Sequence, residues 1–537
     1  MSDSSIRRDV GPFALMLTGL GSIIGSGWLF GAWKASVLAG PDAIWAWVIG
    51  AAVITTIALT YAELGAMFPE SGGMVRYSQY SHGSLVGFIG AWANWIAIVS
   101  VIPVEAEASV QYMASWPWAW AQGMYVPAPG GRGELTPPGL AIAAALVIVY
   151  FLLNFWSVKL FARSNSAITV FKLVVPALTA VVLIAGGFNR ENFSVGIDGG
   201  AHTTDFAAVL TAVATAGIVF SFNGFQSPVN LAGEARDPER SIPFAIFGAI
   251  ALATVVYLLL QIAFLGAVPP ALLNADGGWH AIELRSPFAE LALLLNLNWL
   301  AMLLYADAFV SPSGTGITYT ATTARMLFGM QRNGTMPVMF GSVHPKWGVP
   351  RAAMWFNLGV AYLFLFFFRG WGTLAAVISV ATIISYLTGP VSAMTLRRTA
   401  PELRRPLHMR GLPLLACLAF VFSTELLYWA KWPLTGEIIL LVVAALPVYF
   451  YYQWRRDWAD FARQLAGAWW LIFYLPSIAA VSYVGSTRFG GLGWLPYGRD
   501  LAVVAVVGLV FYFWGLRCGW RTPDVDVVGR TQARPSA

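Results

Sequence analysis

Apolar stretches long enough to cross a bilayer recur along this chain from residue 12 to residue 518. About 20 residues of α-helix span the hydrocarbon core, and a window of that length predicts about fourteen membrane helices. Only 11% of the 537 residues are charged, and the mean hydropathy is +0.67. A soluble domain carries about a quarter charged residues, because its surface must face water. The chain is therefore predicted to be an all-α integral membrane protein.

The expected helices are joined mostly by short loops. They occupy residues 12–36, 41–67, 84–113, 139–159, 166–187, 206–231, 243–268, 297–325, 351–368, 373–396, 411–430, 436–453, 467–485 and 500–518. The first apolar run is longer than a signal peptide and lacks a small-residue cleavage pattern, so we expect a retained helix. Most of the 32 Lys and Arg residues fall in alternate loops. The positive-inside rule then places both termini in the cytoplasm, in a multi-pass protein of the cell membrane.

The remaining composition argues against other classes. The net charge of +6 comes from basic residues dispersed among loops, whereas a nucleic-acid-binding protein gathers them on one face. Cys417 and Cys518 lie in or beside apolar segments, far from any metal-binding spacing, and the five histidines are scattered among loops. We therefore expect no nucleic-acid partner, no cofactor and no metal site.

Three glycines stand at the centre of the first expected helix, in Gly21-Ser-Ile-Ile-Gly-Ser-Gly27. Glycine destabilises a helix interior by about 1 kcal/mol relative to alanine, so the cluster favours unwinding. Unwound backbone is tolerated at membrane depth only where its polar groups find partners, and a substrate can be that partner. The alternative is close helix packing through small residues.

A second polar interruption, Phe220-Ser-Phe-Asn-Gly-Phe-Gln226, lies in the sixth expected helix. Each interrupted helix opens a block of five helices. This is the pattern of inverted-repeat transporters, whose substrate site lies between the two breaks.

Four motifs occur in order along the first 400 or so residues: GSIIGSG, PESGGMVRYSQY, AGEARDPERSIP and ARMLFGMQRNGTMP. They resemble the signatures of the amino acid, polyamine and organocation permease superfamily. The helix count and the eighth-helix phrase ADAFVSPSGTGITYTATTAR most resemble its aspartate:proton symporter branch.

The resemblance implies a LeuT-like five-plus-five inverted repeat followed by four additional helices. We expect a cytoplasmic tail at 1–11, a first repeat at 12–187, a second repeat at 205–397, additional helices at 411–518 and a second cytoplasmic tail at 519–537.

The resemblance also implies that an amino acid binds at the two breaks. The freed N–H groups of Gly25, Ser26 and Gly27 and the positive end of the following half-helix would hold its carboxylate. Its ammonium would donate to freed carbonyls around Ser22, Ile23, Phe220 and Ser221. The expected substrate-binding residues are Ser22, Ile23, Ile24, Gly25, Ser26, Gly27, Phe220, Ser221 and Asn223. Trp28 departs from the superfamily pattern, in which smaller aliphatic residues are usual, and is expected either to narrow the pocket or to form an outer gate.

Lys172 lies roughly 10 Å into the fifth helix at 1.5 Å per residue. It resembles the lysine that occupies a sodium position in proton-coupled relatives, where its charge disfavours a cation. The alternative is a lysine whose head reaches back to the inner interface.

Glu105 resembles a third-helix glutamate that affects transport in a neighbouring branch, and is a second candidate for proton coupling. A structural acid with internal hydrogen bonds is an equal alternative. Glu107 is two residues away and turns about 200° around the helix, so both cannot face one cavity. We favour a structural role for Glu107.

The eighth helix carries a polar stripe at steps of three or four residues, formed by Asp307, Ser311, Thr315, Thr318 and Thr322. Asp307 is a third coupling candidate, and Ser311 with Thr315 would bind sodium or line the permeation path. Interhelical hydrogen bonding is the alternative. Glu234 and Arg236 are candidates for an inner gate of ion pairs, against a solvated loop face.

These features favour a secondary active amino-acid transporter, a proton symporter working by alternating access on an aspartate- or glutamate-like substrate. An amino-acid exchanger and a sodium-coupled carrier are the alternatives on the same scaffold. A polytopic membrane enzyme is a distant alternative, because it would need a histidine, paired-carboxylate or metal constellation near a membrane face. We expect an amino acid, protons and the lipid bilayer as partners, and no enzymatic activity.

Overall fold

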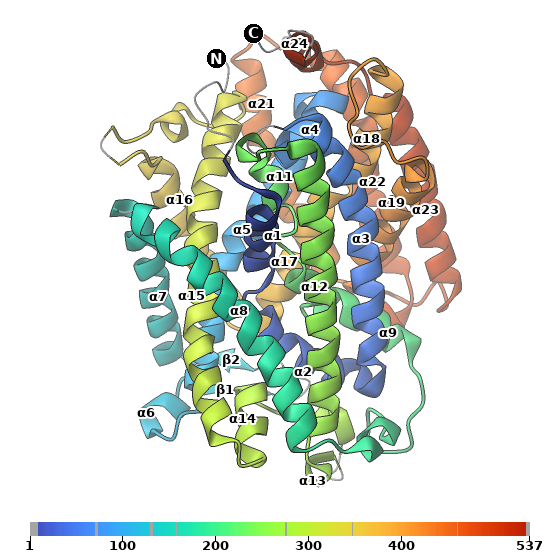
Figure 1. Cartoon of the computed structure of the whole chain (residues 1–537). Coiled ribbons are helices and arrows are strands. Elements are labelled where there is room, and N and C mark those ends of the chain that lie inside the picture. The colour runs from blue at the N-terminus through green and yellow to red at the C-terminus, as the bar shows by residue number, and fades with distance from the viewer. Residues whose placement is uncertain are drawn as a thin grey trace.

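The computed structural model describes residues 9–69, 73–128, 131, 133–156, 158–273, 277–345, 347–458 and 460–532. Long helices run roughly parallel through it from one end to the other (Figure 1). The prediction of an all-α membrane protein is confirmed. The one sheet in the described part of the chain is a two-stranded antiparallel ribbon, β1 (Tyr125–Val126) with β2 (Glu134–Leu135).

The first expected repeat forms five membrane crossings, the first of which is split in two. Its helices are α1 (Pro12–Ile23), α2 (Gly27–Ala39), α3 (Ala43–Met67), α5 (Ser84–Met113), α7 (Pro137–Trp156) and α8 (Val158–Gly186). A further helix, α4 (Gly73–His82), precedes α5 and was not expected from hydropathy, because its polar face suits a membrane surface and not its interior.

The second expected repeat again begins with a broken helix. Its elements are α9 (Phe206–Thr215), α10 (Ile218–Ser221), α11 (Ser227–Asn230), α12 (Pro238–Ala267), α15 (Asn298–Arg332), α16 (Arg351–Phe367), α17 (Trp371–Tyr386) and α18 (Thr388–Thr399). In Figure 1 the chain runs downward from α1 to α2 and upward from α9 to α11, so the two broken helices run in opposite directions. This is the arrangement of a LeuT-like fold.

Additional helices follow the second repeat. They are α19 (Leu412–Trp429), α20 (Leu434–Val443), α21 (Leu446–Trp454), α22 (Phe461–Val484), α23 (Arg499–Cys518) and the short α24 (Pro523–Gln532). α19 packs against α3, α23 and α18, so these helices cover one flank of the core and are not a separate domain.

Short elements complete the two ends of the molecule. These are α6 (Ala119–Gln122), α13 (Pro270–Leu273), α14 (Pro287–Leu294) and 3-10 turns at 40–42, 190–194, 232–234, 278–281, 338–341 and 487–489. In Figure 1, α4 and α24 lie at the upper end, whereas α6, β1, β2, α13 and α14 lie at the lower end. The segments expected in the cytoplasm and those expected outside therefore lie at opposite ends.

Ten stretches of the described helices are long and apolar enough to cross a membrane by length and composition. One of them joins α2 with α3, and the broken first and sixth helices leave pieces too short to count. The polar α15 also falls below this threshold. The apolar α16 has 17 residues and is only slightly too short. Three of the four missing segments thus lie where polarity and breaks concentrate, as expected around a transport site.

Several helices extend beyond their predicted ends. α8 begins at Val158, eight residues before the predicted start of its segment, and α15 continues seven residues past residue 325 to Arg332. Hydropathy detects only the part of a helix inside the hydrocarbon, so polar turns that project toward water are assigned to loops.

Candidate substrate and coupling site

The first membrane helix is broken where its glycines predict. α1 ends at Ile23 and α2 begins at Gly27. Within the break the N–H of Gly25 donates to the Ile23 carbonyl at 3.1 Å, and not to the carbonyl four residues back. The ladder of helical hydrogen bonds is therefore interrupted in the middle of the first crossing. The backbone N–H and C=O groups of the break are open to other partners.

The sixth crossing is broken twice. α9 ends at Thr215, Gly217 takes a φ of +84°, and α10 covers one turn before a second irregular stretch. There Gly224 takes a φ of +123°, and a Cβ on it would lie 2.6 Å from the carbonyl carbon of Ser22. A side chain is excluded here, because the backbones of the two broken helices touch.

Tyr257 of α12 joins the two breaks. Its hydroxyl lies 3.2 Å from the Ile23 carbonyl oxygen and 3.0 Å from that of Ser221. Both carbonyls were expected to receive a substrate ammonium. In this structure a tyrosine hydroxyl takes that position instead, so an incoming ammonium would share or replace its hydrogen bonds.

Lys172 reaches from α8 to the break in α1. Its Nζ donates to the Gly21 carbonyl at 3.1 Å and to Thr315 Oγ1 at 2.6 Å, and the residue is only 2% exposed. The head group therefore faces the bundle interior and does not reach back to the interface.

Glu105 of α5 contacts the same break from the opposite side. Its Oε2 accepts the Ser26 N–H at 2.9 Å. Its Oε1 is buried and has no partner in the described part of the chain. Ser26 was expected to offer this N–H to a substrate carboxylate, but here the protein's own carboxyl group receives it.

Asp307 and Ser311 form a second polar contact on α15. Ser311 Oγ donates to Asp307 Oδ1 at 2.6 Å. The other carboxyl oxygen of Asp307 and the indole nitrogen of Trp28 are both buried without a partner among the described residues. Trp28 also lies near Phe288, with 5.7 Å between the ring centroids and the rings tilted, so its ring packs against α14.

The polar stripe of α15 divides into two parts. Asp307, Ser311 and Thr315 are buried and face the site. Thr318 and Thr322 instead donate to carbonyls of their own helix, those of Gly314 and Thr318. The first three residues therefore line the candidate site. The hydrogen bonds of the last two hydroxyls lie within α15 itself and match neither a path role nor the interhelical alternative.

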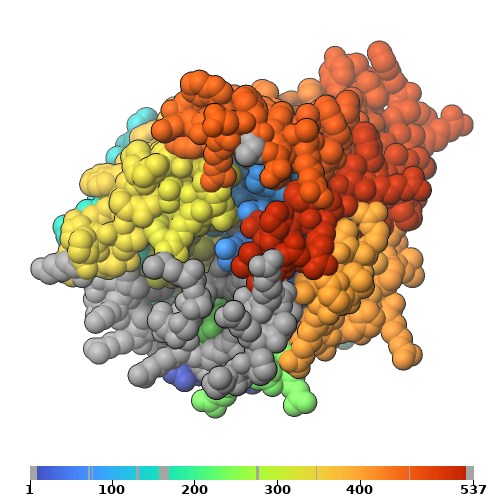
Figure 2. Space-filling view, turned by 90° about the horizontal axis from the view of Figure 1, so that it is seen from above, coloured from blue at the N-terminus to red at the C-terminus, as the bar shows by residue number. Residues whose placement is uncertain are grey.

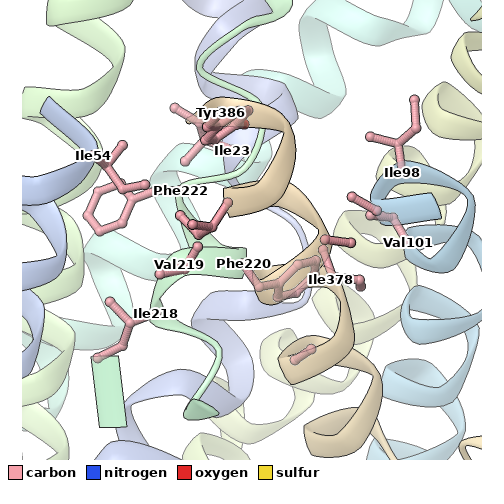
Figure 3. Close-up of a cluster of buried hydrophobic side chains, with 14 of the residues drawn as sticks. Ile23, Ile54, Ile98, Val101, Ile218, Val219, Phe220, Phe222, Ile378 and Tyr386 are labelled. Atoms are coloured by element: carbon pink, nitrogen blue, oxygen red, sulfur yellow. The ribbon is translucent and has the colours of Figure 1, made fainter. Parts of the chain in front are cut away.

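Aromatic rings close the site toward the lower end of the molecule. Trp371 of α17 donates its indole N–H to Ser26 Oγ at 2.8 Å. Its ring lies 4.8 Å from Phe30 and 5.9 Å from Phe220. Figure 3 shows Phe220 turned toward Ile378 of α17, within a cluster of apolar side chains. The break is thus sealed on this side by packed rings.

Asn223 lies in the irregular stretch between α10 and α11 and takes part in a local network there. Its Oδ1 accepts from Gln226 Nε2 at 2.9 Å and from the Tyr386 hydroxyl at 3.2 Å. Its Nδ2 has no partner among the described residues. The amide N–H donors of Asn223 therefore remain available to a ligand, while Gln226 and Tyr386 hold its orientation.

Glu234 and Arg236, the candidates for an inner gate, are half-buried and exposed, respectively. Glu234 and Arg236 make no ion pair with each other in the described part of the chain. Their backbones instead hold the segment before α1, since Val10 N–H donates to the Glu234 carbonyl and Arg236 N–H to the Val10 carbonyl. The nearby ion pair at 3.0 Å joins Glu239 to Arg404.

The site therefore combines one ammonium and two carboxyl groups around an unwound backbone segment. Gly25 lies between Glu105 and Thr315, because a Cβ there would be 2.5 Å from Glu105 Oε1 and 3.2 Å from Thr315 Oγ1. Such an arrangement can bind a zwitterion and move protons. Sequence reasoning missed Tyr257, Trp371 and Tyr386, since a lone aromatic residue in an apolar helix looks like ordinary core.

Comparison with known proteins also indicates amino-acid transport. The family described as amino acid permease matches residues 10–452. The chain belongs to this family. The match covers the first ten crossings, in which both breaks and Lys172 lie, and extends into the additional helices.

Two relatives of this permease cover nearly its whole length. A glutamate/serine transporter of Bacillus subtilis is 57% identical over 519 residues, which are 97% of this chain and 95% of the relative. An aspartate-proton symporter of the same species is 36% identical over 527 residues, 97% of this chain and 98% of the relative. A branched-chain amino acid permease is 26% identical over 464 residues, 85% of this chain and 95% of the relative. The permease is thus an amino-acid transporter of the membrane.

Proposed function

We propose that this permease is a proton symporter for acidic amino acids that works by alternating access. The observation that carries the proposal is the position of Lys172, whose ammonium bridges the break in α1 and the wall of α15. A bound sodium ion would use the same carbonyl and hydroxyl oxygens. A fixed ammonium repels a cation there, so proton movement is favoured over sodium as the source of coupling.

Glu105 supplies a route by which a proton and a substrate bind together. A substrate carboxylate and ionised Glu105 compete for the same N–H of Ser26. Protonation weakens Glu105 as an acceptor, because hydrogen bonds to charged acceptors are roughly twice as strong as neutral ones. A proton on Glu105 therefore frees Ser26 for the substrate, and it also removes a negative charge that would repel an acidic side chain.

The names of the relatives favour an acidic substrate, since one is a glutamate/serine transporter and the other an aspartate-proton symporter. Thermal unfolding of the purified permease with each of the twenty amino acids identifies the substrate, because a ligand of the native state raises the midpoint by mass action. The screen is run at two pH values, with and without sodium. Stabilisation by apolar but not acidic amino acids would contradict the proposal.

Replacement of Lys172 by Ala tests the coupling. In proteoliposomes we expect loss of accumulation driven by a pH gradient, while exchange of internal for external substrate persists. Thr315→Ala removes one of the two hydrogen-bond acceptors of Lys172 and should therefore lose part of the pH-driven accumulation. Thr318→Ala is the matched control, because that hydroxyl bonds only within its own helix. Unchanged pH-driven uptake in Lys172→Ala would exclude Lys172 from coupling.

Glu105→Gln tests the proton route separately. The amide resembles a protonated carboxyl group, so we expect substrate binding that no longer depends on pH, with exchange retained and pH-driven accumulation lost. A wild-type pH dependence of binding in this variant would assign the proton to another group.

A sodium-coupled carrier is the second candidate. Ser311 and Thr315 would supply its oxygens, but Thr315 already receives Lys172 and Ser311 already donates to Asp307. The thermal screen with and without sodium distinguishes the proton symporter from the sodium-coupled carrier. In a sodium-coupled carrier, the substrate should raise the unfolding midpoint only when sodium is present.

A further inference from the structure

A cavity of about 440 Å³ opens at the end of the molecule that carries α4 and α24. Figure 2 shows this face hollowed between the end of α15, the turn from α21 to α22 and the C-terminal segment, with α4 and the start of α5 below. Its volume falls within the range of about 300–1,000 Å³ that is typical of small-molecule sites. It shares no residue with the site around Lys172.

Three arginines from three separate elements line this cavity. Arg76 comes from α4, Arg332 ends α15 and Arg456 lies in the turn after α21. The acidic lining residues are Asp460 and Asp524. Positive charge therefore exceeds negative charge in the cavity.

Asp524, Arg332 and Arg456 each contact a neighbouring residue beside the cavity. Asp524 Oδ2 already accepts from Gln79 Nε2 at 2.8 Å. Arg332 lies over the Phe328 ring at 4.9 Å, and Arg456 donates to the Asn333 carbonyl at 3.4 Å. A guanidinium has five N–H donors, so these contacts leave most donors of Arg332 and Arg456 available.

Two glycines beside the cavity leave space for the side chains of Arg456 and Gln464. Gly334 takes a φ of +70°, and a Cβ on it would collide with the Arg456 guanidinium. Gly83 takes a φ of +92°, and a Cβ on it would collide with Gln464, whose Oε1 accepts the Ser84 N–H at 2.6 Å. Arg456 is thus seated against the end of α15 by close packing.

We propose that this cavity binds a phosphate-bearing anion, either a free solute or the headgroup of an anionic phospholipid. Guanidinium forks match phosphate oxygens in pairs, and several converging arginines suit a multiply charged group better than a single carboxylate. Amides and hydroxyls of Gln79, Ser84, Asn333 and Thr522 are also among the lining groups.

A ligand in this cavity would tie the core to the additional helices. α4 and α15 belong to the first ten crossings, whereas the α21–α22 turn and the C-terminal segment follow them. Occupancy would hold these inner ends together and slow transport. This consequence, unlike binding itself, rests on the proposed alternating-access mechanism.

Binding is measured with inorganic pyrophosphate as the probe, on the full-length permease in phosphatidylcholine nanodiscs without amino-acid substrate. We expect saturable heat by titration calorimetry and a raised unfolding midpoint. Arg456→Gln and Arg332→Gln should each weaken binding about tenfold or more. Arg455→Gln is the matched control, because its side chain is exposed beside Arg456 but does not line the cavity.

The salt dependence of binding needs no variant. Binding to exposed arginines should weaken between 50 and 500 mM NaCl, because the Debye length falls over that range from about 14 Å to about 4 Å.

Nanodiscs of phosphatidylglycerol distinguish the two sources of the ligand. Reduced pyrophosphate binding there identifies a lipid headgroup, whereas equal binding in both lipids identifies a free solute. No binding to the wild type, equal binding by all four proteins, or equally strong binding of glutamate at the cavity would overturn the proposal.

Discussion

At Gly25 the absence of a side chain forms part of the site. The residue separates Glu105 from Thr315, with space for a hydrogen but not for a methyl group. The sequence predicted a break at this glycine from its helix propensity alone. The structure adds that the residue is also a steric requirement of the polar cluster, which propensity does not report.

Gly25→Ala tests this requirement. The added methyl group would displace the Glu105 carboxyl group from Ser26, so we expect at least a tenfold loss of substrate affinity, corresponding to about 1.4 kcal/mol. Affinity is measured by substrate-dependent thermal shift.

Gly329→Ala is the matched control for that variant. It lies in α15 with nothing within 4 Å of an added Cβ, so it should bind substrate normally and gain up to about 1 kcal/mol of helix stability. Wild-type affinity in Gly25→Ala would refute the steric argument.

Among the secondary-structure elements, a third helix, α12, connects the two broken helices. The backbones of the two broken helices touch at Gly224 and Ser22, and Tyr257 of α12 lies against both. The hydroxyl has one proton, which the two carbonyls share, and this shared contact favours movement of the two breaks as a unit. The motifs predicted each break separately, but a contact across more than 200 residues of sequence could not be predicted without the fold.

Tyr257→Phe removes only the hydroxyl from this contact. We expect a loss of stability of about 1 kcal/mol, because buried hydrogen bonds in membrane bundles contribute little individually. We also expect a larger change in maximal transport rate than in substrate affinity, since the breaks would no longer be held to each other.

Tyr362→Phe is the control for Tyr257→Phe. Its hydroxyl bonds to the Ala144 carbonyl at 3.1 Å, away from the breaks. Equal changes in transport rate in the two variants would argue against a positioning role for Tyr257.

Across the whole molecule, the C-terminal segment is fastened to α4. Trp520 N–H donates to the Ser81 carbonyl at 3.0 Å, and Thr522 Oγ1 donates to the Tyr80 carbonyl at 2.8 Å. His82 ends α4 fully buried beneath this segment. Its Nε2 donates to the Gly515 carbonyl at 2.9 Å, which completes the attachment of α23.

This attachment makes the stability of the permease depend on pH. Burial is the main reason that the pKa of His82 falls from 6.5 to about 4, and Arg398 lowers it further against the Gly515 hydrogen bond. Between these values the unfolded chain takes up a proton that the native state does not. Stability is therefore lost as the pH falls from about 6.5 toward 4, by about 3 kcal/mol in all at 1.36 kcal/mol per pKa unit.

Thermal unfolding between pH 7.5 and pH 4.5 measures this effect. We expect the midpoint of the wild type to fall across the window, whereas His82→Gln begins lower and changes less. His280→Gln, at an exposed loop position, should follow the wild type. Parallel pH profiles for all three proteins would show that His82 does not control the loss.

The sequence by itself determined the membrane class, the two breaks, the order of the helices and a short list of buried charges. These follow from composition and local propensity, which act over a few residues. Only the tertiary structure decided that Glu105 takes the Ser26 N–H, that Lys172 faces inward and not the interface, and that Glu234 and Arg236 are held by their backbones. These contacts join residues tens to hundreds of positions apart. Which buried polar groups satisfy one another depends on how the helices pack, because many pairings are chemically equivalent and geometry alone selects among them.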